Sequence, residues 1–159
     1  MVKAQVTSFG DADEKLLNEL NQRLNHAKTV VAAVNVKLFT MHLRYDDRQN
    51  LENDQTDCLR YVSEAKEYIS QLRTRQTLVT RFALINTLYW LNFVERSFIE
   101  RLTRLPKDPA DVVYRKAFLD LVESRSELRT AHTQFVERMA QLLDAVDSRL
   151  QSSATSTAR

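Results

Sequence analysis

The sequence predicts an all-α fold, an antiparallel bundle of three or four long helices. Glycine occurs once and proline twice among 159 residues. Because tight turns depend on these residues, the chain has few turns and its elements must be long. Apolar residues also recur at alternating spacings of three and four, which is typical of a helix packed against other helices.

The length is that of one domain, and the composition, 43% hydrophobic and 28% charged, is that of a folded globular chain. We expect a short extended lead-in over residues 1–10, ending at the only glycine. A single helical-bundle domain follows over residues 11–150. The small polar residues at 151–159 predict a disordered tail.

The first helix is expected to begin with Asp11 or Asp13 as its cap and to end in the polar cluster at residues 46–50. Val30, Val36 and Phe39 widen its apolar stripe. The positions at heptad spacing are Leu17, Leu20, Leu24, Ala27, Val31, Val34, Leu38, Met41 and Tyr45.

A second helix is expected to begin near residues 51–54 and to continue towards Pro106. Its early apolar positions are Cys58, Val62, Ala65, Ile69 and Leu72. One interpretation is a single long or kinked helix over 51–105, and the other is a break at 74–77. The first is favoured slightly, because no glycine or proline interrupts the segment.

Pro106 ends this segment, and Asp108 and Pro109 are expected to start the last helix, which runs to about Leu150. Its heptad-spaced positions are Tyr114, Phe118, Leu121, Arg125, Leu128, His132, Phe135, Met139, Leu142 and Val146.

The run from Phe82 to Val94 is apolar on every face of a helix, so it must be covered by its own chain or by a partner. At about 13 residues it is too short to span a membrane, and no membrane insertion is expected. Aromatic residues are favoured anchors of protein–protein contacts. The expected interface residues are Phe82, Tyr89, Trp90, Phe93 and Phe98.

Charge is unevenly distributed, because residues 58–107 carry about +5 while the whole chain carries +2. Basic residues around the proline turn are candidates for a modest anion-binding patch. They are Arg101, Arg104, Lys107, Arg115 and Lys116.

Arg125 and His132 lie one heptad apart in the stretch RSELRTAH. This stretch resembles the Arg/His signature of HEPN-type helical ribonucleases, which implies a site where histidine moves protons and arginine holds phosphate charge. Alternatively, both are polar seam residues that fix helix register. We favour this second interpretation.

Metal and cofactor sites are not expected. One glycine leaves no glycine-rich phosphate loop, and one cysteine, Cys58, leaves no multi-cysteine metal site. No Glu-x-x-His pair is present. The unpaired cysteine and the lack of a signal-peptide pattern predict a reducing, cytoplasmic location.

These observations predict a non-enzymatic assembly or adaptor subunit, as a homo-oligomer or as part of a larger complex. The alternative is a nucleic-acid-associated helical protein, including a HEPN-like ribonuclease that uses Arg125 and His132. A third option, a bundle that binds a small molecule, has no specific motif in its favour.

Overall fold

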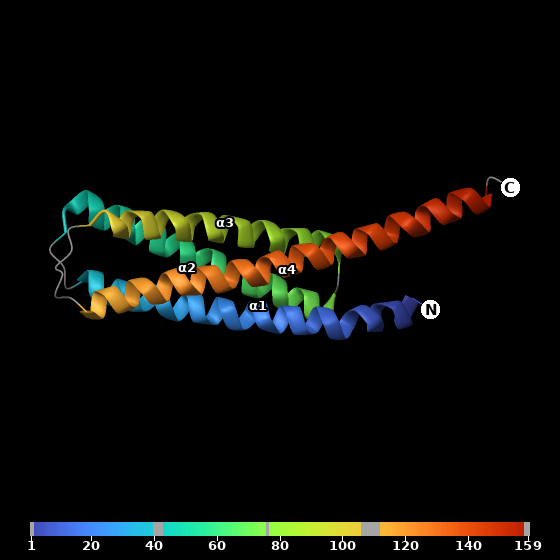
Figure 1. The fold of residues 1–159 in the computed structure, drawn as a ribbon, viewed down its shortest axis with the longest axis horizontal. Helices are drawn as coiled ribbons and strands as arrows, with labels where there is room; N and C mark the ends of the chain where they lie inside the picture. Colours follow the sequence, from blue (N-terminus) through green and yellow to red (C-terminus); the bar gives the residue numbers. More distant parts are fainter. Residues whose placement is uncertain (1, 40–42, 76, 106–111, 158–159) are drawn as a thin grey trace.

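A computed structural model of the chain describes residues 2–39, 43–75, 77–105 and 112–157, with side chains over 13–38, 43–75, 77–105 and 115–151. These residues form helices α1 (Val2–Phe39), α2 (Tyr45–Thr74), α3 (Leu78–Thr103) and α4 (Val112–Thr157). Successive helices run in opposite directions (Figure 1). The prediction of an all-α antiparallel bundle is confirmed.

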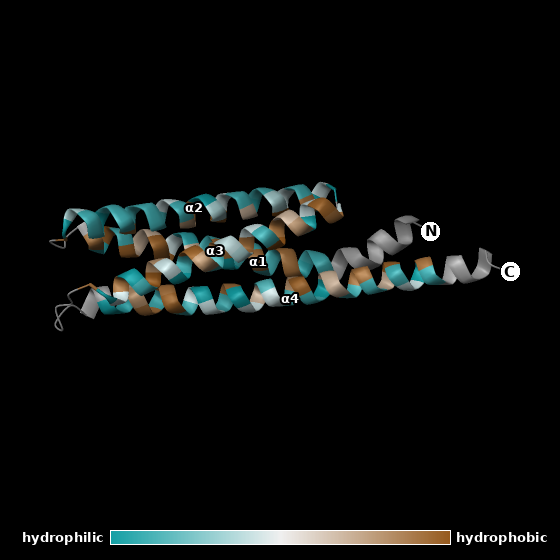
Figure 2. Cartoon of the chain, turned by 90° about the horizontal axis from the view of Figure 1, so that it is seen from above, coloured by the Kyte–Doolittle hydropathy of each residue, from teal (hydrophilic) through white to brown (hydrophobic). Residues whose placement is uncertain are grey.

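The four helices pack in a ring. Each helix packs against the helix before and after it, and α4 closes the ring on α1. Figure 1 shows α1 and α3 on opposite sides of the bundle, and Figure 2, turned by 90°, shows the same for α2 and α4. Each helix therefore buries one side against two neighbours and exposes the other.

Heptad spacing predicted most of the core correctly. The buried residues at predicted positions are Leu17, Leu20, Leu24, Ala27, Val31, Val34, Leu38, Cys58, Val62, Ala65, Ile69, Leu72, Leu121, Leu128, Phe135, Met139 and Leu142. Val36, Tyr45 and Val146 are exposed instead. The side chains of Phe39, Met41 and Tyr114 lie outside the described residues.

The boundary between the first two helices differs from the prediction. Tyr45 and the polar cluster at 46–50 begin α2 rather than ending α1. Asp46 and Asp47 occupy the first turn of α2, where carboxylates favour the positive end of the helix dipole. This placement also accounts for the exposure of Tyr45.

Both ends of the chain are more helical than expected. Helix α1 begins at Val2, so residues 2–10 are not an extended lead-in and Asp13 is not an N-cap. Helix α4 continues to Thr157 instead of ending at Leu150. A lone glycine costs a helix only about 1 kcal/mol, and no proline interrupts residues 151–157. The expected cap at Asp108 and Pro109 lies outside the described residues.

The favoured prediction of one long or kinked helix over 51–105 is wrong, and the alternative of two separate helices is confirmed. Helix α2 ends at Thr74, and Arg75 is extended, with φ −139° and ψ 111°. Thr77 caps α3, because its hydroxyl accepts a hydrogen bond from the backbone N–H of Thr80 at 3.2 Å. The fold-back lets α2 and α3 bury their apolar sides against each other, which one straight helix would leave uncovered.

A buried ion cluster joins three helices near the α2–α3 turn. The Asp13 carboxylate on α1 is 0% exposed. Its Oδ2 accepts from Arg81 Nη2 of α3 at 2.7 Å, and its Oδ1 accepts from Arg138 Nε of α4 at 3.1 Å. The two guanidinium groups compensate the buried carboxylate in the low-dielectric interior, and the fixed geometry of the cluster sets the register of α1, α3 and α4.

Removing the Asp13 carboxylate should destabilise the bundle. Asp13→Ala removes the buried carboxylate that Arg81 and Arg138 both bind, at an expected loss of about 3 kcal/mol or more in the free energy of unfolding. Urea unfolding followed by circular dichroism measures this loss. Glu14→Ala, at the exposed neighbouring position, is the control and should change stability by less than about 0.5 kcal/mol. Equal effects of the two substitutions would contradict the role of Asp13.

Candidate functional site

The outer side of α3 exposes a row of large apolar side chains, here called the aromatic surface: Leu78, Val79, Phe82, Tyr89, Trp90 and Phe93. The four aromatic side chains among them are between 44% and 59% exposed. Trp90 packs edge-on between Tyr89 and Phe93, with ring centroids 6.0 Å apart in both pairs. The row extends about 23 Å along the helix, so it is larger than an isolated exposed apolar residue.

The opposite side of the same segment belongs to the core. Leu84, Leu88 and Leu91 are buried against the neighbouring helices. The chain itself therefore covers only one side of the Phe82–Val94 run, although the sequence predicts that all sides need to be covered. Phe98 is fully buried, which corrects its prediction as an interface residue, because a core side chain cannot contact a partner.

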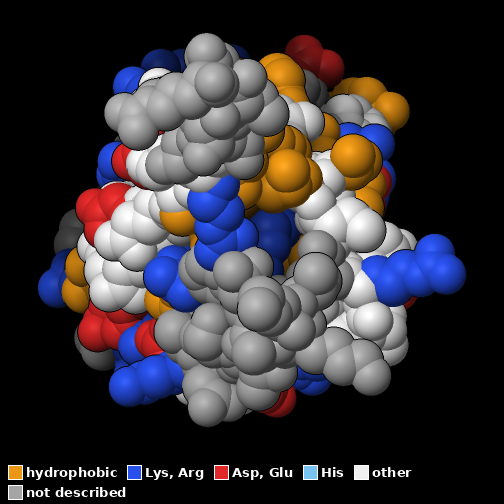
Figure 3. Space-filling model, turned by 90° about the vertical axis from the view of Figure 1, so that its right-hand side faces the viewer, with side chains coloured by type: hydrophobic (Ala, Val, Ile, Leu, Met, Phe, Trp, Pro, Cys, Tyr) orange, Lys and Arg blue, Asp and Glu red, His pale blue; other side chains and the backbone are white. Residues whose placement is uncertain are grey.

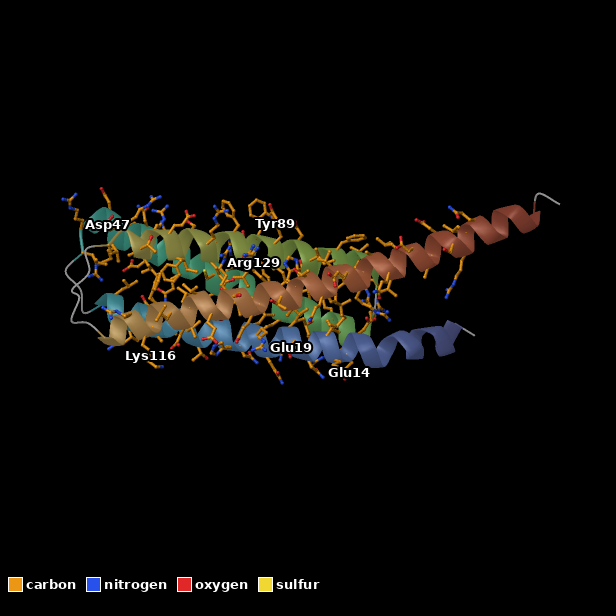
Figure 4. The ribbon with its side chains drawn as sticks, in the orientation of Figure 1. Glu14, Glu19, Asp47, Tyr89, Lys116 and Arg129 are labelled. Carbon is orange, nitrogen blue, oxygen red and sulfur yellow. The ribbon has the colours of Figure 1, made fainter. Side chains whose placement is uncertain are left out.

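A groove of about 350 Å³ borders the aromatic surface where α3 meets α4. Its lining residues are Tyr89, Asn92, Phe93 and Arg96 of α3 with Arg125 and Arg129 of α4. In Figure 4 the Tyr89 ring projects away from the bundle, at the same level as Arg129. Arginine and aromatic side chains together are the composition of a protein-binding surface.

The three arginines of the groove differ in how they are held. Arg125 donates from Nε to the backbone oxygen of Asn92 at 3.4 Å. Arg96 pairs with Glu100 of its own helix at 3.1 Å, and both groups are well exposed. Arg129 is exposed and has no ion pair within the described part of the chain. Arg129 is therefore the guanidinium most available to a ligand or partner.

A buried carboxyl group lies on the inner side of α3. Glu95 is 1% exposed, and neither of its oxygens has a hydrogen-bond partner among the described residues. Burial raises its pKa to about 8, against the opposing effect of Arg125. Burial, followed by the Glu95 charge, also raises the pKa of the Cys58 thiol. At neutral pH Glu95 is mostly protonated and Cys58 is an unreactive core residue.

Arg125 and His132 share the side of α4 that faces α3. Burial lowers the pKa of His132, and a hydrogen bond with the backbone of Ile85 acts in the opposite direction. Burial also lowers the pKa of Arg125, and repulsion from Arg129 adds to this effect. Only Arg125 lines the groove. Both residues contact α3, and the structure does not gather them around one cavity.

The predicted anion-binding residues are spread out. Arg101 pairs with Asp54 of α2 at 2.9 Å, and Lys116 pairs with Asp120 at 3.3 Å. Arg101 and Arg104 line a cavity of about 120 Å³ with α2 residues, not with α4. Arg115 is exposed, and Lys107 lies outside the described residues. The two ion pairs offset part of the positive charge on which the predicted patch depends.

The described residues hold neither a cluster suited to a metal ion nor a membrane-spanning helix. No group of three or more His, Cys, Asp and Glu side chains is placed to hold a metal ion there. No helix in this part of the chain combines the length and apolarity needed to cross a membrane.

Two features of this region were not predicted, although the sequence pattern contains a signal for each. Glu95 falls at heptad spacing with Leu84, Leu88 and Leu91, a signal that predicts a buried carboxyl group. Arg96 lies three residues after Phe93, on the same side of the helix. The sequence does not show that Arg129 belongs to the same site, because only the packing of α4 on α3 brings it close to these residues.

Burial of Glu95 should make stability depend on pH with a definite sign. Its pKa rises from 4.5 to about 8 on folding. Between these pH values the folded chain keeps a proton that the unfolded chain has lost. The free energy of unfolding should therefore fall by roughly 3–5 kcal/mol as the pH rises from about 4.5 to about 8.

Urea unfolding at pH 5 and pH 8 measures this dependence. Glu95→Gln keeps the shape of the side chain without its titration, so it should remove most of the loss. Glu100→Gln alters an exposed carboxylate of the same helix and should keep the wild-type dependence. An unchanged pH dependence in Glu95→Gln would contradict the assignment.

Comparison with known proteins found no likeness from which a function could be transferred. No model of a protein family matches the chain, no curated protein matches it, and no solved structure matches its fold. The surface of the bundle itself is therefore the basis for inferring a function.

Proposed function

We propose that this protein is a non-enzymatic helical subunit that assembles with protein partners through the outer side of α3. The supporting observation is the aromatic surface, which the chain leaves uncovered although its seam residues fill a complete core. Exposed aromatic side chains in a row are costly in water and are stabilised when a partner covers them.

Arginine residues beside the aromatic surface favour a protein partner over a purely apolar one. Arg96 and Arg129 lie at its edge, where guanidinium groups bind carboxylates and also stack on aromatic rings. Buried aromatic residues surrounded by charged groups are the usual arrangement of an interface. The nucleic-acid alternative has less support, because Arg125 contacts Asn92 and His132 is partly buried.

Truncating the aromatic surface should prevent association without unfolding the chain. The double variant Trp90→Ala and Phe93→Ala removes two exposed rings, so it should keep the helical circular dichroism spectrum. Light scattering after size exclusion should then show a smaller species than the wild type. Tyr45→Ala is the matched control, because Tyr45 is 77% exposed at the start of α2. Association equal to that of the wild type would contradict the proposal.

A photoreactive residue tests contact with any protein partner. Benzoylphenylalanine placed at Tyr89, in cells that express the chain, should form covalent protein adducts on irradiation. The same residue at Tyr45 should form far fewer, because that position lies away from the aromatic surface. Equal labelling at both positions, or none at Tyr89, would show that the aromatic surface is not a protein interface.

A further inference from the structure

We propose that the partner of the aromatic surface is a second copy of this chain, with the two α4 helices antiparallel about a two-fold axis beside Val136. This inference rests on the proposed function and specifies its partner. Three observations support it: a second seam on α4, a charge pattern that complements itself, and a segment of α4 that extends beyond the bundle.

Helix α4 carries an exposed stripe at spacings of three and four, in addition to its buried one. Its members are Val122, Ser126, Arg129, Thr133, Val136, Ala140, Asp144 and Asp147, all of them exposed. Such spacing is typical of a helix that packs against another helix. The small side chains of Ser126, Thr133 and Ala140 would let a second helix approach closely. Within the described residues no helix covers this stripe.

The charges of the stripe are arranged so that it complements itself. An axis between Val136 and the next residue places Thr133 opposite Ala140 of the second copy. It likewise places Arg129 opposite Asp144, at about 11 Å on either side of the axis. The structure gives neither Arg129 nor Asp144 a charged partner among the described residues. Two-fold symmetry would form this ion pair twice.

The same axis brings the aromatic surface into the contact. Within one chain Arg125 lies against Asn92 and His132 against Ile85, so the antiparallel register places Val136 level with Phe82. The two Phe82 side chains would therefore lie near the axis. Figure 3 shows hydrophobic side chains gathered on one flank at the end where α4 projects, next to Lys and Arg side chains.

The part of α4 that extends beyond the bundle would cover the remaining residues of the aromatic surface. Figure 1 shows that α4 continues well past the α2–α3 turn. In the proposed pair, its residues from Asp144 to Leu150 would lie over Tyr89 and Phe93 of the other copy. Leu150 is 63% exposed in the single chain, so the contact would bury apolar residues on both sides.

A second copy fits the charges better than a partner of one sign. The stripe is basic at Arg129 and acidic at Asp144 and Asp147. A uniformly acidic partner would be repelled by the two aspartates, and a uniformly basic one by Arg129. An antiparallel copy places Arg129 opposite Asp144 twice and places Asp147 opposite the uncharged Ser126, so no like charges of the stripe face each other.

Exchanging the paired charges tests the register. Light scattering and sedimentation equilibrium of the full chain should show a dimer. Arg129→Glu and Asp144→Arg should each raise its dissociation constant about tenfold or more, by placing like charges opposite each other. The double variant should restore wild-type affinity. Glu64→Arg reverses an exposed charge on α2 and should have little effect.

Cysteine cross-linking locates the axis. Val136→Cys should form an intermolecular disulfide on oxidation, because residues beside a two-fold axis meet their own copies. Val122→Cys is the matched control, since both valines are 39% exposed on the same stripe but Val122 lies about 22 Å from the axis. The native Cys58 is buried and should stay reduced.

The outcomes separate this inference from the proposed function. A monomeric wild-type chain that still forms protein adducts from position 89 would reject the second copy and retain assembly through α3. A dimer that the Trp90 and Phe93 substitutions dissociate, but the charge exchange does not restore, would reject this register alone. A monomer without adducts would reject both.

Discussion

The arrangement of the helices depends on the interaction of the Asp13 carboxylate with Arg81 and Arg138. Apolar seams attract helices to one another but tolerate sliding by a turn, because leucine, valine and alanine at heptad spacing offer similar contacts in each register. The two short hydrogen bonds from Arg81 and Arg138 to Asp13 tolerate no such shift. They fix the positions of α1, α3 and α4 relative to one another along the bundle axis. The positions of the aromatic surface and of the groove depend on this register.

Helix α3 has two roles that are usually separate. Its inner side supplies Leu84, Leu88 and Leu91 to the core, while its outer side carries the aromatic surface. A four-helix ring can cover only the inner side of each helix, so apolar residues placed all around α3 exceed what one chain can bury. The excess is specific in position and composition, which supports the proposed partner site over scattered surface apolarity.

The contact between α3 and α4 contains several buried polar groups. Glu95, Asn92 and Ser124 place buried oxygens there without hydrogen-bond partners among the described residues, and Arg125 lies at its edge. Groups of this kind reduce stability, because each loses water without gaining an equal partner. This contact is also the one beside the groove, where the proposed partner would bind.

Sequence alone determined the fold class, because helical periodicity and the scarcity of glycine and proline act locally along the chain. It also determined most core positions, since Leu17 to Leu38 and Cys58 to Leu72 need only their spacing to be recognised. Tertiary packing decided the rest. The end of α2 at Thr74 depends on α2 folding back onto α3, and the roles of Asp13, Phe98 and Arg129 depend on which helix lies opposite. Such pairings join residues far apart in the chain, and spacing within one segment does not encode them.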